Sequence, residues 1–255
     1  MTERKKYELT DEFIEHWSGK KLYRIKALID FGLVVAGSLG GFVESENNLD
    51  HNGNAWVYGN ARVYGDAEVY GNARVYGNAR VCGDAWVYGN AEVYGDARVY
   101  GDAEVYGNAR VYGNAEVYGD ARVYGNARVY GNARVYGDAE VYGNARVYGN
   151  ARVYGNARVY GKAEVYGNAW VYGNAEVYGN AEVCEQRSVI WFSVVGTENG
   201  TLTIYKSKDG SLLATRGCFS GTVDEFLAKS AQVHDEKTKR EYELLIEVAK
   251  SRILG

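Results

Sequence analysis

Hydrophobic and polar positions repeat every six residues between Gly53 and Cys184, through 22 uninterrupted hexads of the form G-[N/D]-A-x-V-Y, with Lys162 at one turn position. Within a hexad, Ala and Val alternate with position x, which is the period of a short β-strand with Ala and Val facing inward. Gly followed by Asn or Asp is typical of a turn, because these residues tolerate a positive φ. Each hexad therefore predicts one short strand and one corner, and their repetition predicts a parallel β-solenoid with a Val/Ala core.

The length of one coil follows from the turn positions. The block GDAEVYGNARVYGNA occurs three times, 36 residues apart, which allows coils of 12, 18 or 36 residues. Five of the six turn aspartates are spaced by 18 residues, and only Asp96 lies outside the series. These five are Asp66, Asp84, Asp102, Asp120 and Asp138. The spacing favours a triangular solenoid of 18 residues per coil with about seven regular coils, ~35 Å long at ~4.8 Å per coil.

The segments that flank the hexads differ from them, as the ends of a solenoid require. Residues 1–52 predict an N-terminal β cap and an irregular first coil, with a hairpin that turns at Ser18-Gly19. Residues 185–255 predict a small C-terminal α/β module of three strands and two helices, with the helices at roughly 223–231 and 236–253. Thr222 and Glu225 form the pattern of a capping box at the start of the first helix. The predicted fold is mainly β, with residues 53–184 as the solenoid.

The hexads VYGNAR resemble the hexapeptide repeat of left-handed β-helices, and more closely the YdcK-type β-solenoid proteins of bacteria, phages and prophages. The lead-in LYRIKALIDFGLVVAGSLGGFVESENNLDHNGNAWVYGNARVYG shares this resemblance, and the tail GCFSGTVDEF…H is similar to a module that follows such solenoids in phage-associated proteins. The resemblance implies left-handed coiling, whereas the general preference of parallel crossovers is right-handed. It implies no biochemical role.

Composition narrows the classes of function. The 255 residues carry a net charge of −4, which points neither to nucleic acid nor to an anionic membrane. The N-terminal residues lack the apolar core of a signal peptide, and the longest apolar segment, FGLVVAG, is too short to span a membrane. The cysteines Cys82, Cys184 and Cys218 are too scattered for a disulfide framework. We therefore expect a cytoplasmic protein without metal or other cofactor.

Reactive side chains are scarce. The hexads contain no His, Ser or Thr, although general acid–base chemistry usually uses His. We expect no enzymatic activity; the alternative is an acyltransferase-like enzyme of the hexapeptide-repeat type, for which His51 is the histidine nearest to the solenoid. Cys218 and His234 are the one Cys/His pair of the C-terminal module. We expect a buried structural thiol and a loop histidine there, with a catalytic or metal role as the alternative.

The outward positions x hold eleven Arg, eight Glu and three Trp, and they are unevenly distributed when they are sorted by the 18-residue coil. One face carries the arginine column Arg62, Arg80, Arg98, Arg134 and Arg152, interrupted by Glu116. Another carries mainly Glu and shares its hexads with the aspartate edge. Like charges one coil apart repel, so these columns are candidates for binding an anionic and a cationic surface; the alternative is a merely solvated surface. Trp56, Trp86 and Trp170 are candidate anchors.

These patterns predict a non-enzymatic scaffold or binding protein of phage or prophage type, which presents Tyr, Arg and Glu ladders to a protein partner or for self-association. We do not expect nucleic acid to be the main partner, because coils that advance ~4.8 Å lose register with phosphates that advance ~3.4 Å. A third hypothesis is a phage inhibitor of a host defence protein that acts through a charged face. A monomer, a dimer and a trimer are all compatible with the sequence.

Overall fold

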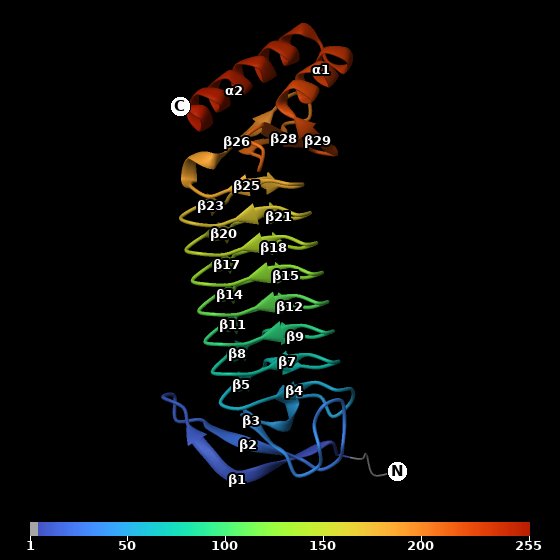
Figure 1. The fold of residues 1–255 in the computed structure, drawn as a ribbon, viewed down its shortest axis with the longest axis vertical. Coiled ribbons are helices and arrows are strands. Elements are labelled where there is room, and N and C mark those ends of the chain that lie inside the picture. The colour runs from blue at the N-terminus through green and yellow to red at the C-terminus, as the bar shows by residue number, and fades with distance from the viewer. Residues whose placement is uncertain (1–4) are drawn as a thin grey trace.

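Each hexad forms one short strand and one corner, and three hexads complete a coil of 18 residues, as the sequence predicts. The computed structural model describes residues 5–255, which form a straight rod with a cap at each end (Figure 1). Val63 pairs in parallel with Val81, and Val81 with Val99, so each coil lies directly above the preceding one. At the corners a glycine is required: Gly107 has φ +69°, and a Cβ there would lie 3.0 Å from the backbone nitrogen of Gly125.

The strands of successive coils form three parallel sheets, one on each face of the rod. The first face consists of β3 (Leu39–Val43), β5 (Arg62–Gly65), β8 (Arg80–Gly83), β11 (Arg98–Tyr100), β14 (Glu116–Tyr118), β17 (Arg134–Tyr136), β20 (Arg152–Tyr154) and β23 (Trp170–Val171). The second face consists of β6 (Glu68–Val69), β9 (Trp86–Val87), β12 (Glu104–Val105), β15 (Arg122–Val123), β18 (Glu140–Val141), β21 (Arg158–Val159) and β24 (Glu176–Val177). The third face consists of β4 (Trp56–Val57), β7 (Arg74–Val75), β10 (Glu92–Val93), β13 (Arg110–Val111), β16 (Arg128–Val129), β19 (Arg146–Val147), β22 (Glu164–Val165) and β25 (Glu182–Val183).

The core of the rod is a continuous column of the Ala and Val side chains of every hexad, nearly all with zero exposure. Backbone hydrogen bonds join each coil to the next, as between the Arg98 nitrogen and the Ala115 oxygen at 2.9 Å. Such a stack is held by contacts between neighbouring coils alone, so its stability is a sum of coil and interface contributions.

The N-terminal cap is a hairpin of β1 (Tyr7–Glu15) and β2 (Lys21–Ala27), which extends the first-face sheet through β3. β3 is antiparallel to β2 but parallel to β5, and it therefore converts the antiparallel cap into the parallel rod. A 3-10 turn, Glu46–Asn48, follows β3. The side-chain amide of Asn48 donates to the oxygens of Gly65 and Ala67, which satisfies acceptors at the start of the stack.

The C-terminal module has four strands, not the three that the sequence predicts. These are β26 (Val189–Val195), β27 (Gly200–Lys206), β28 (Leu212–Arg216) and β29 (Phe219–Thr222), in one antiparallel sheet, after a 3-10 turn at Gln186–Ser188. The sequence predicts one strand over SLLATRGCF, but this segment turns at Gly217, which has φ +57°, and is divided between β28 and β29. Two helices follow, α1 (Val223–Val233) and α2 (Glu236–Leu254). The predicted capping box is present, because the Glu225 nitrogen donates to the Thr222 hydroxyl at 3.2 Å.

The sheet of the module lies between the last coil and the two helices (Figure 1). Side chains of this sheet that face the rod accept hydrogen bonds from the exposed backbone edge of the last coil. The backbone nitrogens of Glu176 and Tyr178 donate to the hydroxyls of Thr203 and Tyr205. Leu202, Ile204 and Ala214 on the other face of the sheet share a core with Phe226 of α1 and Ile246 of α2. No helix within residues 5–255 is long and apolar enough to cross a membrane.

Candidate functional site

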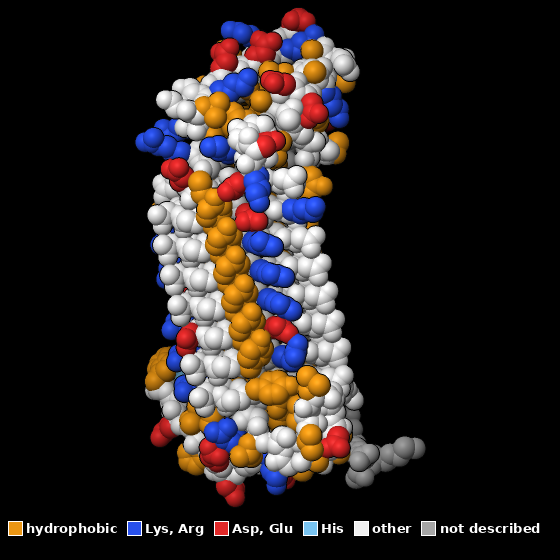
Figure 2. All heavy atoms as spheres, viewed as in Figure 1, with side chains coloured by type: hydrophobic (Ala, Val, Ile, Leu, Met, Phe, Trp, Pro, Cys, Tyr) orange, Lys and Arg blue, Asp and Glu red, His pale blue; other side chains and the backbone are white. Residues whose placement is uncertain are grey.

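The tyrosines form three stacked ladders along the rod, as the hexads predict. Within a ladder, rings of neighbouring coils lie nearly parallel at about 4.8 Å, as Tyr100 and Tyr118 do. Partial burial, followed by the neighbouring carboxylate of Glu92, raises the pKa of Tyr76 to about 12. Figure 2 shows a continuous hydrophobic stripe along the rod beside a column that is mainly basic. The ladders therefore offer a flat surface whose side chains are already ordered.

The arginine column of the first face is partly neutralised. The carboxylate of Glu116 forms ion pairs with the guanidinium groups of the coils on both sides, with Arg98 at 3.5 Å and with Arg134 at 3.2 Å. The guanidinium of Arg152 lies over the Trp170 ring, 5.1 Å from its centroid. Within residues 5–255, Arg62 and Arg80 have no carboxylate at ion-pair distance, although they stand in adjacent coils in direct register. The two adjacent arginines of this face without a carboxylate therefore lie in its N-terminal coils, whereas Arg152 near the other end lies over the Trp170 ring.

The third face carries a run of arginines that the sequence analysis did not single out. Arg110, Arg128 and Arg146 stand one above another. Arg110 pairs with Glu92 at 3.4 Å and Arg146 with Glu164 at 3.5 Å, so within the described residues only Arg128 of this run has no carboxylate at ion-pair distance. The same 18-residue sorting applied to this face would have found the run. Its pairing makes it a weaker candidate than Arg62 with Arg80.

The aspartate edge forms at one corner, between the first and second faces. Asp66, Asp84, Asp102, Asp120 and Asp138 are exposed and lie in successive coils. At the other two corners, Asn side chains hydrogen-bond from coil to coil, as from the Asn108 amide to Asn126 at 3.1 Å. A side-chain bond of this kind appears in the aspartate corner only after it changes to Asn, from Asn156 to Asn174. Residues 5–255 contain no cluster of His, Cys, Asp or Glu able to hold a metal ion.

The three tryptophans have different environments. Trp56 is 1% exposed, so it is not a surface anchor, contrary to the prediction. Phe31 and Tyr7 of the N-terminal cap pack edge-on against its ring, at centroid distances of 5.2 and 6.0 Å. Trp170 is half-covered and contacts Arg152, whereas Trp86 is 44% exposed. Trp86 alone retains the exposure that an anchor requires.

His51, the basis of the acyltransferase alternative, is part of the cap. Its ring stacks on Tyr7 at 4.4 Å, and its Nδ1 accepts a hydrogen bond from the Lys6 nitrogen at 3.2 Å. Its Nε2 lies 3.7 Å from a carboxylate oxygen of Glu46. These contacts order the junction between the cap and the first coil, and they hold Nδ1 in a hydrogen bond, whereas Nε2 is buried without a hydrogen-bond partner.

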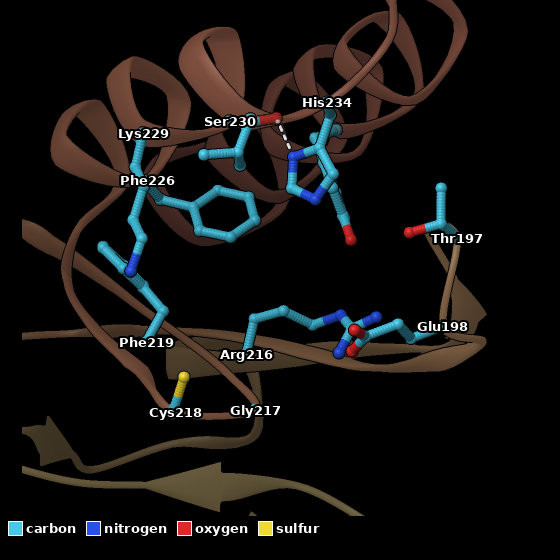
Figure 3. A pocket seen from close by; sticks show the side chains of 12 residues that line it. Thr197, Glu198, Arg216, Gly217, Cys218, Phe219, Phe226, Lys229, Ser230 and His234 are labelled. Carbon is cyan, nitrogen blue, oxygen red and sulfur yellow. Dashed lines mark hydrogen bonds between the residues drawn. The ribbon is translucent and has the colours of Figure 1, made fainter.

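A pocket of about 190 Å³ lies in the C-terminal module, between the strand ends and the helices (Figure 3). His234 and Ser230 approach it from the end of α1, and Arg216 from the opposite wall. His234 Nδ1 lies 3.1 Å from the Ser230 hydroxyl. The aromatic rings of Phe219, Phe226 and Tyr242 form a series of edge-to-face contacts along the pocket.

Cys218 and His234 both line this pocket, but no hydrogen bond joins them among the described residues. Cys218 is exposed, in the turn between β28 and β29, and is not the buried thiol that we expected. Gly217 and Cys218 leave the sheet as the chain reverses, which exposes the thiol. The two residues therefore line the same pocket but do not form a hydrogen-bonded nucleophile and base. Sequence reasoning missed Arg216 and Tyr242, which reach the pocket only through the fold.

The repeats of the rod are similar to a known family of repeats. A family model described as YdcK Beta solenoid repeat matches residues 55–71, 67–83, 73–89, 103–119, 115–129, 127–143, 139–154 and 151–167. These segments lie within the hexads and include neither the cap nor the C-terminal module. No curated protein matches the chain. The similarity is therefore to a β-solenoid repeat, in agreement with the observed coils.

Proposed function

We propose that the protein is a non-enzymatic binding scaffold, in which the rod presents the first face to an acidic surface of a protein partner. The observation that carries this proposal is the pair Arg62 and Arg80. The two residues pair in register in adjacent coils, and within residues 5–255 neither has a carboxylate at ion-pair distance, while Arg98 and Arg134 of the same column share Glu116.

Rigidity supports the same function. Because the coils fix the backbone, the two arginines need little further ordering on binding, and pre-organisation of this kind favours affinity. Two adjacent like charges without a carboxylate between them cost stability in the free protein, and an acidic partner would relieve that cost. The resemblance of the lead-in to YdcK-type proteins of bacteria and phages, and of the tail to a module of phage-associated proteins, supports a role in the cytoplasm of a bacterial host.

A quantitative co-purification from bacterial cytosol tests the proposal, with the full chain as bait. The double variant Arg62→Glu/Arg80→Glu should reduce capture of a stoichiometric partner by about tenfold or more. Arg128→Glu is the control on another face, since Arg128 is exposed and has no carboxylate at ion-pair distance within residues 5–255; it reverses one charge where the double variant reverses two. It should leave capture unchanged.

Equal capture by both variants would refute binding through the first face. A closed homo-oligomer without any captured protein, measured by light scattering, would replace partner binding with self-association. If the captured partner is a host defence protein, its inhibition should be lost in the double variant and retained in Arg128→Glu.

A further inference from the structure

We infer that the pocket of the C-terminal module binds a compact organic anion: a carboxylate or phosphate group attached to a small apolar body. This goes beyond the scaffold function, since it concerns a second site at the opposite end of the rod. It is independent of Arg62 and Arg80.

Arg216 carries the inference. One of its terminal nitrogens donates to the Val195 oxygen at 3.0 Å, and its Nε is buried without a hydrogen-bond partner. Within residues 5–255, no carboxylate lies at ion-pair distance from this guanidinium. A buried donor on a permanent cation is costly when it is unsatisfied, and an arginine fork suits planar carboxylate and phosphate groups.

The backbone around Arg216 is arranged to admit it. A Cβ at Gly200 would lie 2.3 Å from a terminal nitrogen of Arg216, and one at Gly196 would lie 1.9 Å from the Tyr242 hydroxyl. Glycines at both positions therefore allow the two polar side chains to lie against the turn between β26 and β27. Val194 next to this turn has φ +59°, a strained conformation for a β-branched residue, and such strain is concentrated at functional sites.

The remaining lining suits an anion with an apolar part. Lys229 lies over the Phe219 ring, 5.4 Å from its centroid, and adds a second cation to the pocket. Among the described residues, the lining of the pocket contains one carboxylate, that of Glu198. Phe219 and Phe226 supply an apolar wall, and the volume of about 190 Å³ admits only a small group.

The test is a binding titration of the full chain, in which the NMR signals of the histidine ring protons report binding. The chain has three histidines, so the His234 signal can be assigned from its loss in His234→Gln. The anionic probes are N-acetylphenylalanine and phenyl phosphate, and the neutral control is N-acetylphenylalanine amide. We expect saturable shifts of His234 with at least one anion and none with the amide. The probe that binds more tightly assigns the source, a carboxylate or a phosphate monoester.

Variants locate the site. Arg216→Gln should weaken binding at least about tenfold, because a charge-assisted hydrogen bond is lost. Since this change could also affect folding, a second variant, Lys229→Gln, changes an exposed cation of α1 that lines the pocket. Lys237→Gln is its control, with the same change of charge at an exposed position outside the pocket. Equal weakening by the two lysine variants would overturn the inference. Equal shifts with the neutral amide would also overturn the inference, as would unchanged affinity of a folded Arg216→Gln variant for the anions. A third contrary result is the absence of shifts with both anions at about 10 mM, a concentration that detects Kd values weaker than about 1 mM.

Discussion

The aspartate edge should cost the rod stability, and Asp102→Asn should recover part of it. Asp102 is the middle member of five exposed carboxylates in successive coils, with Asp84 below and Asp120 above. The coils repeat at 4.8 Å, as the Tyr100–Tyr118 ring distance shows. Replacing one carboxylate by the neutral amide removes the repulsion from both neighbours. It also allows at this corner the side-chain hydrogen bond that Asn residues form from coil to coil at the other two corners.

The magnitude follows from the coil spacing. Two unit charges 4.8 Å apart repel by about 0.9 kcal/mol in the dielectric of water. Screening at about 0.15 M salt reduces this to about 0.5 kcal/mol, so two neighbours contribute about 1 kcal/mol. The gain should rise to about 1.5 kcal/mol at about 0.01 M and fall to about 0.4 kcal/mol at about 1 M.

Calorimetric melting of the full chain across this salt series measures the effect, since 1 kcal/mol shifts the Tm of a chain of this size by about 2–4 °C. The matched control is Asn108→Asp at a neighbouring corner. It removes the hydrogen bond that the Asn108 amide donates to Asn126, and should destabilise with little dependence on salt. A salt-independent gain for Asp102→Asn, or a loss at low salt, would refute the electrostatic reasoning.

Two further predictions concern the charged and aromatic ladders. Glu92→Gln should destabilise the rod by about 1–3 kcal/mol, because Glu92 is 9% exposed and pairs with both Arg74 and Arg110. Glu104→Gln, at a more exposed carboxylate, should cost at most about 1 kcal/mol, and equal shifts of the urea midpoints would contradict this ranking. The tyrosines should also limit alkaline stability. Burial raises the pKa of Tyr76 and of Tyr100 to about 12, whereas tyrosines of the unfolded chain ionise at about pH 10. Between these values the folded state holds more protons, so its stability falls as pH rises. The far-ultraviolet circular dichroism signal of the β structure should be lost as tyrosinate absorbance reaches its full value; complete ionisation of the tyrosines with intact β structure would contradict the prediction.

The 18-residue coil was predictable because every hexad meets the same neighbours. The partners of a hexad lie one coil away in the sequence, as Val63 and Val81 do, so a local pattern contains the whole packing arrangement of the rod. The Val/Ala core and the stacked tyrosines follow from that arrangement alone. The capping box at Thr222 and Glu225 was equally local, since both of its hydrogen bonds lie within one helical turn.

The environments that depend on non-periodic contacts were decided by the tertiary structure. Trp56 has the sequence context of every other outward residue, yet the cap residues Phe31 and Tyr7 cover it. In the C-terminal module, Arg216, His234 and Tyr242 come from a strand, a helix end and another helix. No period relates these positions. The sequence by itself thus determined the repeating rod, because its contacts recur at a fixed separation. The tertiary structure decided the covered tryptophan and the pocket, because their contacts occur once.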